Sequence, residues 1–218
     1  MKNLKKRTVT ILLLFTMTIT LTGCGADFDA SGYITACLDA NAHGEFAAYA
    51  EITQTSEDEV AKMYNDMLDQ EISYLDAYNI SDEKKESFRQ LFVELYKNFK
   101  YEVGEAVKND DGSFSVPVTT YKLMVFKDIM AEGETYMTDY VQQEIDAGRT
   151  PTEDDIYGVA VDFMYDSISK NLKALEYDEP VTTNVTVGPT SSDSKIYSIS
   201  QTDLQSLLES MVDIENAQ

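Results

Sequence analysis

The sequence contains few of the residue types on which most reactive sites depend. It has one histidine, two cysteines, four prolines and no tryptophan among 218 residues. A single histidine excludes zinc sites built from several histidines, including the H-E-x-x-H type. The phosphate-binding patterns G-x-x-x-x-G-K and G-x-G-x-x-G and the nucleophile pattern G-x-S-x-G are also absent. The sequence therefore predicts no metal, no cofactor and no catalytic residue.

Basic residues are also scarce. The chain has 17 basic and 39 acidic residues, a net charge of −22. This acidity excludes nucleic acid as a partner, because nucleic-acid binding requires a basic surface. We interpret the charge mainly as a solvated surface. Weak binding of divalent cations by acidic clusters is an alternative that the sequence leaves open.

The N-terminus has the pattern of an export signal. The first seven residues contain four basic side chains and no acidic one, and a largely apolar stretch follows from Val9 to Leu21. The stretch ends in Leu21-Thr22-Gly23-Cys24, which resembles the lipobox of bacterial lipoprotein precursors at all four positions. The resemblance implies cleavage after Gly23 and a diacylglyceryl group on Cys24. An uncleaved membrane-spanning helix and a soluble secreted product are the alternatives. The threonines and the Gly-Cys-Gly end argue against the membrane-spanning helix.

Loss of residues 1–23 would change both the charge and the cysteine count. It removes four basic and no acidic residues, so 13 basic and 39 acidic residues remain and the net charge is −26. Lipidation of Cys24 leaves Cys37 without a disulfide partner. Cys37 lies in an apolar helical pattern, which favours a buried thiol. We expect the lipid, and not the acidic protein surface, to contact the membrane.

The remaining chain predicts a lipidated N-terminus at 24–27, one domain over 28–214 and a frayed tail over 215–218. Before residue 100, apolar residues recur at helical spacing. Helix N-caps are expected at Asp27 or Asp29, at Ser56 and at Ser81, and a helix end at His43-Gly44.

The second half alternates between strand and helix patterns. Strands around 101–107 and 114–118 flank the turn at 109–112, and a change of parity near Pro117 indicates a bulge or an edge strand. Two helices follow, the second capped by Thr150 and burying the apolar residues Ile156, Ala160, Phe163, Met164 and Ile168. Strands at 181–187 and 196–199 precede a last helix. This order predicts a helix-rich α+β domain with about four antiparallel strands in two hairpins and helices on one face.

A few polar residues are candidates for a function. His43 at a helix end suits the helix dipole, and a catalytic base is the alternative. Arg89 and Arg149 are rare cations, which we expect in surface ion pairs more than in an anion site. Paired carboxylates could hydrolyse glycosides, but with 39 acidic residues the sequence selects no pair.

The start of the expected domain supports a second resemblance. Asp29-Ala30-Ser31-Gly32-Tyr33, Cys37-Leu38-Asp39 and His43-Gly44-Glu45-Phe46 resemble small uncharacterised lipoproteins of Gram-positive bacteria, some similar to the NTF2-like or cystatin-like fold. That resemblance implies a curved antiparallel sheet around helices, often with a pocket. It supplies no catalytic residue.

The sequence therefore predicts a lipid-anchored protein at the cell envelope, outside the cytoplasm, with a noncatalytic binding or interaction domain. Its partner is an unknown protein or small molecule. A cell-envelope hydrolase using paired carboxylates and a small solute-binding component of a transporter are the alternatives.

Overall fold

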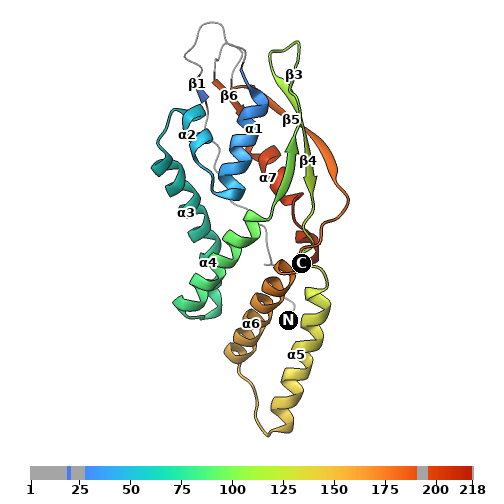
Figure 1. Cartoon of the computed structure of the whole chain (residues 1–218). Coiled ribbons are helices and arrows are strands. Elements are labelled where there is room, and N and C mark those ends of the chain that lie inside the picture. The colour runs from blue at the N-terminus through green and yellow to red at the C-terminus, as the bar shows by residue number, and fades with distance from the viewer. Residues whose placement is uncertain (1–18, 21–27, 191–195, 218) are drawn as a thin grey trace.

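Helices precede, interrupt and follow one antiparallel sheet (Figure 1). The computed structural model describes residues 19–20, 28–190 and 196–217. The predicted α+β class is therefore confirmed. Leu21, Thr22, Gly23 and Cys24 lie outside the described residues. The first half contains the helical elements α1 (Ala30–Leu38), η2 (Asp39–His43), α2 (Ala47–Thr53), α3 (Glu57–Ser73), η3 (Tyr74–Tyr78) and α4 (Asp82–Lys97).

The N-caps predicted for the first half of the chain are confirmed where the structure describes them. The Asp29 side chain accepts a hydrogen bond from the Gly32 amide at 2.8 Å. Ser56 and Glu59 cap α3 reciprocally, and Ser81 caps α4. Asp27 lies outside the described residues. These local bonds satisfy amide groups that a helix start would otherwise leave unpaired.

The sheet has the order β1-β6-β5-β4-β2, with β3 also paired to β4, and every pairing is antiparallel. Its strands are β1 (Ile19–Thr20), β2 (Lys100–Val103), β3 (Val107–Lys108), β4 (Phe114–Tyr121), β5 (Val181–Pro189) and β6 (Ile196–Ile199). β1 lies inside the predicted export signal. Removal of residues 1–23 would leave β6 at the edge of the sheet.

One face of the sheet belongs to the core. Along β4, Phe114, Val116 and Val118 are buried and alternate with half-buried residues. Helix α1 contacts β4 on this buried side, and α7 (Gln201–Glu209) contacts β5. The opposite face is polar, and there Thr119 and Thr182 share a side-chain hydrogen bond. Coverage of one face by helices is therefore confirmed.

Pro117 lies in the central strand β4, so the alternative of an edge strand is wrong. Its carbonyl accepts a hydrogen bond from the Gly104 amide at 2.8 Å, on the side of β2 and β3. Because proline has no amide hydrogen, Pro117 cannot donate a second hydrogen bond on that side. Residues 104–106 accordingly separate β2 from β3. A Cβ at Gly104 would lie 2.7 Å from Pro117 Cγ, which shows how closely the chain passes here.

Two helices form a hairpin that extends beyond the rest of the molecule (Figure 1). They are α5 (Ile129–Asp146) and α6 (Glu153–Leu172). Thr152, and not Thr150, is the N-cap of α6, because its hydroxyl and the Asp155 carboxylate cap each other reciprocally. The predicted burial of α6 is also wrong in part: Ile168 is buried, but Met164 is 37% exposed. In α5 only Ile129 is buried.

The C-terminal segment holds the base of this hairpin. The Leu123 amide donates to the Met211 carbonyl at 2.8 Å, and the Asp213 amide donates to the Leu123 carbonyl at 3.1 Å. The fully buried Asp213 carboxylate accepts hydrogen bonds from the Phe126 amide at 2.9 Å and from Asn216 at 3.0 Å. Of the tail expected to fray over 215–218, residues 215–217 belong to η4 (Ile214–Ala217), and Gln218 lies outside the described residues.

We predict that Asp213→Ala lowers the free energy of unfolding by about 1–3 kcal/mol, because the partly buried Phe126 amide loses its acceptor. Urea denaturation would measure the change. Asp110→Ala, in the exposed turn before β4, is the control and should change stability by less than about 0.5 kcal/mol. Equal stabilities of the two variants would contradict a structural role for Asp213.

Candidate functional site

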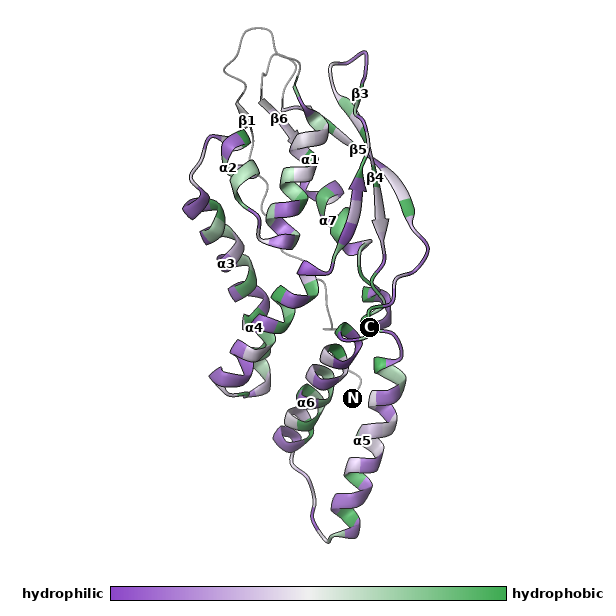
Figure 2. Ribbon diagram, viewed as in Figure 1, coloured by the Kyte–Doolittle hydropathy of each residue, from purple (hydrophilic) through white to green (hydrophobic). Residues whose placement is uncertain are grey.

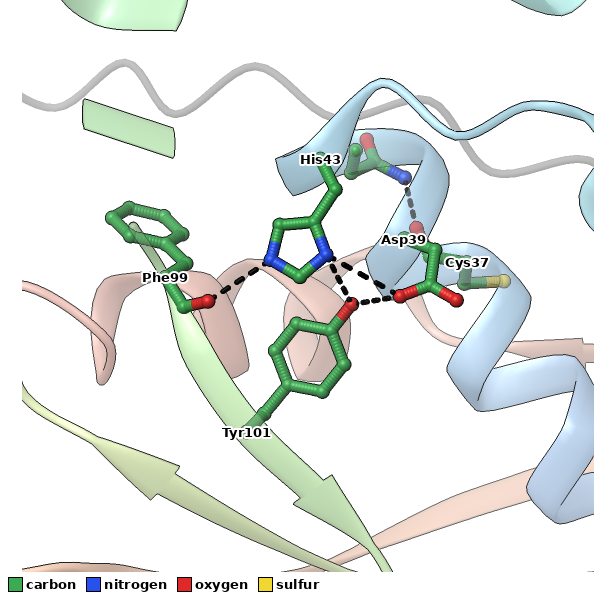
Figure 3. Close-up of polar contacts among 6 residues, drawn as sticks. Cys37, Asp39, His43, Phe99 and Tyr101 are labelled. Atoms are coloured by element: carbon green, nitrogen blue, oxygen red, sulfur yellow. Dashed lines mark hydrogen bonds and ion pairs between the residues drawn. The ribbon is translucent and has the colours of Figure 1, made fainter. Parts of the chain in front are cut away.

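The single histidine lies in a cluster that joins the N-terminal helices to the sheet (Figure 3). His43 ends η2, a π-helical turn that continues α1, and Gly44 follows with a left-handed φ of 68°. Tyr101 comes from β2 and stacks on the imidazole with ring centroids 5.3 Å apart. The predicted helix end at His43-Gly44 is confirmed. π-Helical turns are common at functional sites, so this cluster is the first candidate.

Both ring nitrogens of His43 have partners. Nε2 donates to the Phe99 carbonyl at 3.0 Å. Nδ1 lies 3.5 Å from Asp39 Oδ1 and 3.3 Å from the Tyr101 hydroxyl. The Tyr101 hydroxyl in turn donates to the same Asp39 oxygen. Because every polar atom of the imidazole is engaged, the histidine has no lone pair directed at a substrate.

The electrostatics of the cluster favour an imidazolium–carboxylate pair. The hydrogen bond to Asp39 raises the pKa of His43, although burial opposes it. Burial alone would raise the pKa of Asp39, but hydrogen bonds from His43 and Tyr101 outweigh it and lower this pKa. Burial and the hydrogen bond to Asp39 raise the pKa of Tyr101, so its hydroxyl stays protonated. The cluster therefore acts as a half-buried charged link between η2 and β2.

The other sequence candidates do not join this cluster. Cys37 is fully buried without a disulfide partner, as predicted, and burial raises the pKa of its thiol to about 12. Arg89 forms an ion pair with Asp69 at 3.1 Å, and Arg149 pairs with both oxygens of Glu144 at 2.6 Å. The expectation of surface ion pairs is confirmed for both arginines. Each guanidinium is therefore already neutralised by an acidic side chain, and neither indicates a binding site for an anionic ligand.

Two further acids are buried in separate places. Glu71 of α3 is 6% exposed and accepts a hydrogen bond from the Tyr96 hydroxyl of α4, and Asp213 lies at the hairpin base. Within the described ranges, no group of three or more histidine, cysteine or acidic residues is arranged to hold a metal ion. The two buried acids have structural hydrogen bonds instead.

A second candidate lies on the α5–α6 hairpin, where sequence reasoning expected only core packing. Tyr136 of α5 stacks on Phe163 of α6 with ring centroids 5.0 Å apart. These rings line an open depression of about 620 Å³, which we call the hairpin notch. The lining residues are Asp128, Ala131, Glu132, Thr135, Tyr136, Asp139 and Phe163.

The notch belongs to an exposed part of the fold. Tyr136 is 49% exposed, and Met130 and Ile145 on the same helix are 45% and 56% exposed. Figure 2 shows hydrophobic residues interspersed with hydrophilic ones along both helices. The apolar residues of α5 recur at helical spacing, as they do in a helix that packs on one side, so no sequence signal distinguished this exposed helix from a buried one.

Comparisons with known proteins identify the fold and no activity. No family model matches the chain, and no curated protein matches it. The crystal structure of a "putative lipoprotein (ycdA)" from Bacillus subtilis subsp. subtilis str. 168 is similar, with a TM-score of 0.54 and 17% sequence identity. The match covers 85% of this chain and 56% of that protein, so the chain spans little more than half of its length. At this identity the likeness concerns the fold alone.

We predict a pH dependence of stability that reports on His43. Because its pKa is raised in the folded state, its contribution is complete below the unfolded pKa of about 6.5 and is lost as the pH rises through the folded value. The wild-type melting temperature should therefore fall over this window. His43→Gln should remove this fall, and no other histidine can supply one.

Thermal melts at several pH values between 5.5 and 9 would measure the effect. Tyr101→Phe is the control, because it removes the hydroxyl and keeps the Asp39–His43 pair, so part of the pH dependence should persist. An unchanged pH dependence in His43→Gln would show that the imidazole does not titrate with folding.

Proposed function

We propose that this chain is a lipid-anchored protein outside the cytoplasm whose folded domain is a noncatalytic interaction module. The observation that carries the proposal is the α5–α6 hairpin, which keeps four large apolar side chains at least 37% exposed. They are Met130, Tyr136, Ile145 and Met164. Exposed apolar residues concentrated on one projecting element are typical of a surface that binds another molecule.

The anchor rests on the lipobox at 21–24. A fold neighbour that is described as a lipoprotein is consistent with it. In the part of the chain that the structure describes, no helix is long and apolar enough to cross a membrane. We propose that the two acyl chains on Cys24 hold the protein at a Gram-positive cell membrane, since each buried methylene contributes about 0.8 kcal/mol.

The geometry of the fold suits a tethered module. Residues 24–29 can span at most about 20 Å, so α1 would start close to the membrane. The start of α1 and the tip of the α5–α6 hairpin lie at opposite ends of the molecule (Figure 1). A lipid at Cys24 would therefore leave the hairpin directed away from the bilayer, where a partner has access to it.

The chemistry of the described side chains favours binding over catalysis. His43 is fully hydrogen-bonded, Cys37 is buried, and the two arginines outside the leader are paired. A hydrolase would need an accessible pair of carboxylates in a cleft, and a solute-binding component would need an enclosed pocket. No specific contact among the described residues favours either of these functions.

We predict that cells expressing the wild-type chain incorporate a fatty-acid analogue into it and that Cys24→Ala abolishes the label, because the thioether needs the thiol. Gel fluorescence after metabolic labelling would measure incorporation. Cys37→Ala is the matched control and should keep the label. A labelled Cys24→Ala chain would end the lipoprotein assignment.

We also predict that a photo-crosslinking amino acid at position 136 of the full-length protein captures a partner in intact cells. Tyr74 of η3 is the matched control, because it is 50% exposed against 49% for Tyr136. Crosslinks at 136 that are absent at 74 are expected on immunoblots. Equal yields at both positions would contradict a specific interaction surface on the hairpin.

A further inference from the structure

The charge of the hairpin restricts what can bind it. Residues 128–172 contain eleven acidic side chains against two basic ones, a net charge of −9. Both basic side chains already have acidic neighbours. Arg149 pairs with Glu144 at 2.6 Å, and Lys170 Nζ lies 3.9 Å from Glu132. The hairpin therefore has a large excess of negative charge that its own residues do not compensate.

The hairpin notch combines this charge with an aromatic surface. Tyr136 and Phe163 are stacked with an interplanar angle of 29°, and three of the seven lining residues are acidic. Among the described residues, no basic side chain forms an ion pair with Asp128 or Asp139. Aromatic rings with unpaired carboxylates in the same depression match a cation on an aliphatic stem. The stem packs on the rings while the charged head meets a carboxylate.

We propose that the hairpin notch binds a lysine- or arginine-bearing segment of a partner protein, with a cationic side chain seated on Tyr136 and Phe163 beside Asp139. This inference rests on the proposed interaction function and adds the chemical class of the partner. Arginine fits best, because its planar guanidinium both stacks on aromatic rings and pairs with carboxylates.

Charge disfavours the other occupants of this face. If a second copy of the chain bound here through its own hairpin, two hairpins that each carry a net charge of −9 would repel each other. An anionic lipid surface would be repelled in the same way. Tyr136 and Phe163 offer apolar contact area to a polypeptide side chain that a small free cation would not use.

The test is a binding titration with the full-length chain in uncharged detergent micelles at about 0.15 M salt, where distant surface charges are largely screened. The probe is a fluorescent alanine–arginine helical peptide, and an alanine–glutamate peptide is its counterpart. We expect fluorescence anisotropy to show binding of the first and not of the second.

Variants assign the binding to the notch. Asp139→Lys should weaken the affinity about tenfold, since it reverses one of the pairing charges. Asp110→Lys makes the same charge change in the turn before β4 and should leave the affinity unchanged. Tyr136→Ser should weaken binding, and Tyr74→Ser, at an equally exposed tyrosine, should not. Circular dichroism confirms that each variant is folded.

Three outcomes would overturn the inference. Equal losses in Asp139→Lys and Asp110→Lys would mean that only the overall acidity attracts the peptide. Competition by spermine at the same concentration as the peptide would assign the notch to a small amine. Absence of peptide binding, combined with crosslinks at position 136 in cells, would refute the cationic partner and leave the interaction function standing.

Discussion

The position of the hairpin depends on the hydrogen bonds between Leu123 and the C-terminal residues 211–213. Leu123 donates to Met211 and accepts from Asp213, and the buried Asp213 carboxylate then fixes the Phe126 amide just before α5 begins. The segment between α7 and η4 thus sets the direction in which the α5–α6 hairpin leaves the body. A bond between segments almost 90 residues apart forms only in the complete fold, so the presentation of the hairpin is a property of the whole domain.

The same arrangement separates two kinds of polar cluster. At the junction of η2 and β2, charges are matched: Asp39, His43 and Tyr101 satisfy one another, and the cluster stabilises the contact between helix and sheet. In the hairpin notch, Asp128 and Asp139 have no ion-pair partner among the described residues and line the same depression as Tyr136 and Phe163. A satisfied cluster has little to gain from a ligand, whereas an unsatisfied one gains from any partner that supplies the missing charge. This contrast is why the single histidine is the poorer candidate for function.

Sequence reasoning succeeded where the deciding interaction is local. Ser56 and Glu59 lie three residues apart, so their reciprocal cap follows from the sequence. At α6 the predicted N-cap was two residues too early. Thr150 before Pro151 and Thr152 before Asp155 are both plausible N-caps, and the hydrogen bond from the Thr152 amide to the Asp155 carboxylate decides for Thr152.

Contacts between distant segments could not be predicted. The contact of His43 with Tyr101 spans 58 residues and the stacking of Tyr136 on Phe163 joins two helices, and neither leaves a periodic pattern in the sequence. The alternation of apolar residues predicted the strands of the sheet, but it did not predict that Pro117 lies in a central strand.

The exposed apolar side chains of the hairpin are notable because α5 packs little against the rest of the fold. An 18-residue helix that buries only Ile129 gains little free energy from packing on the body. Its stability must come from α6, which contacts α4, and from the bonds at the hairpin base. A chain selected for stability alone would replace Met130, Tyr136 and Ile145 with polar helix-forming residues, since exposed apolar groups add nothing to the fold. Their presence beside uncompensated carboxylates, on the part of the fold farthest from the start of α1, fits a surface whose stabilising contacts are made with another molecule.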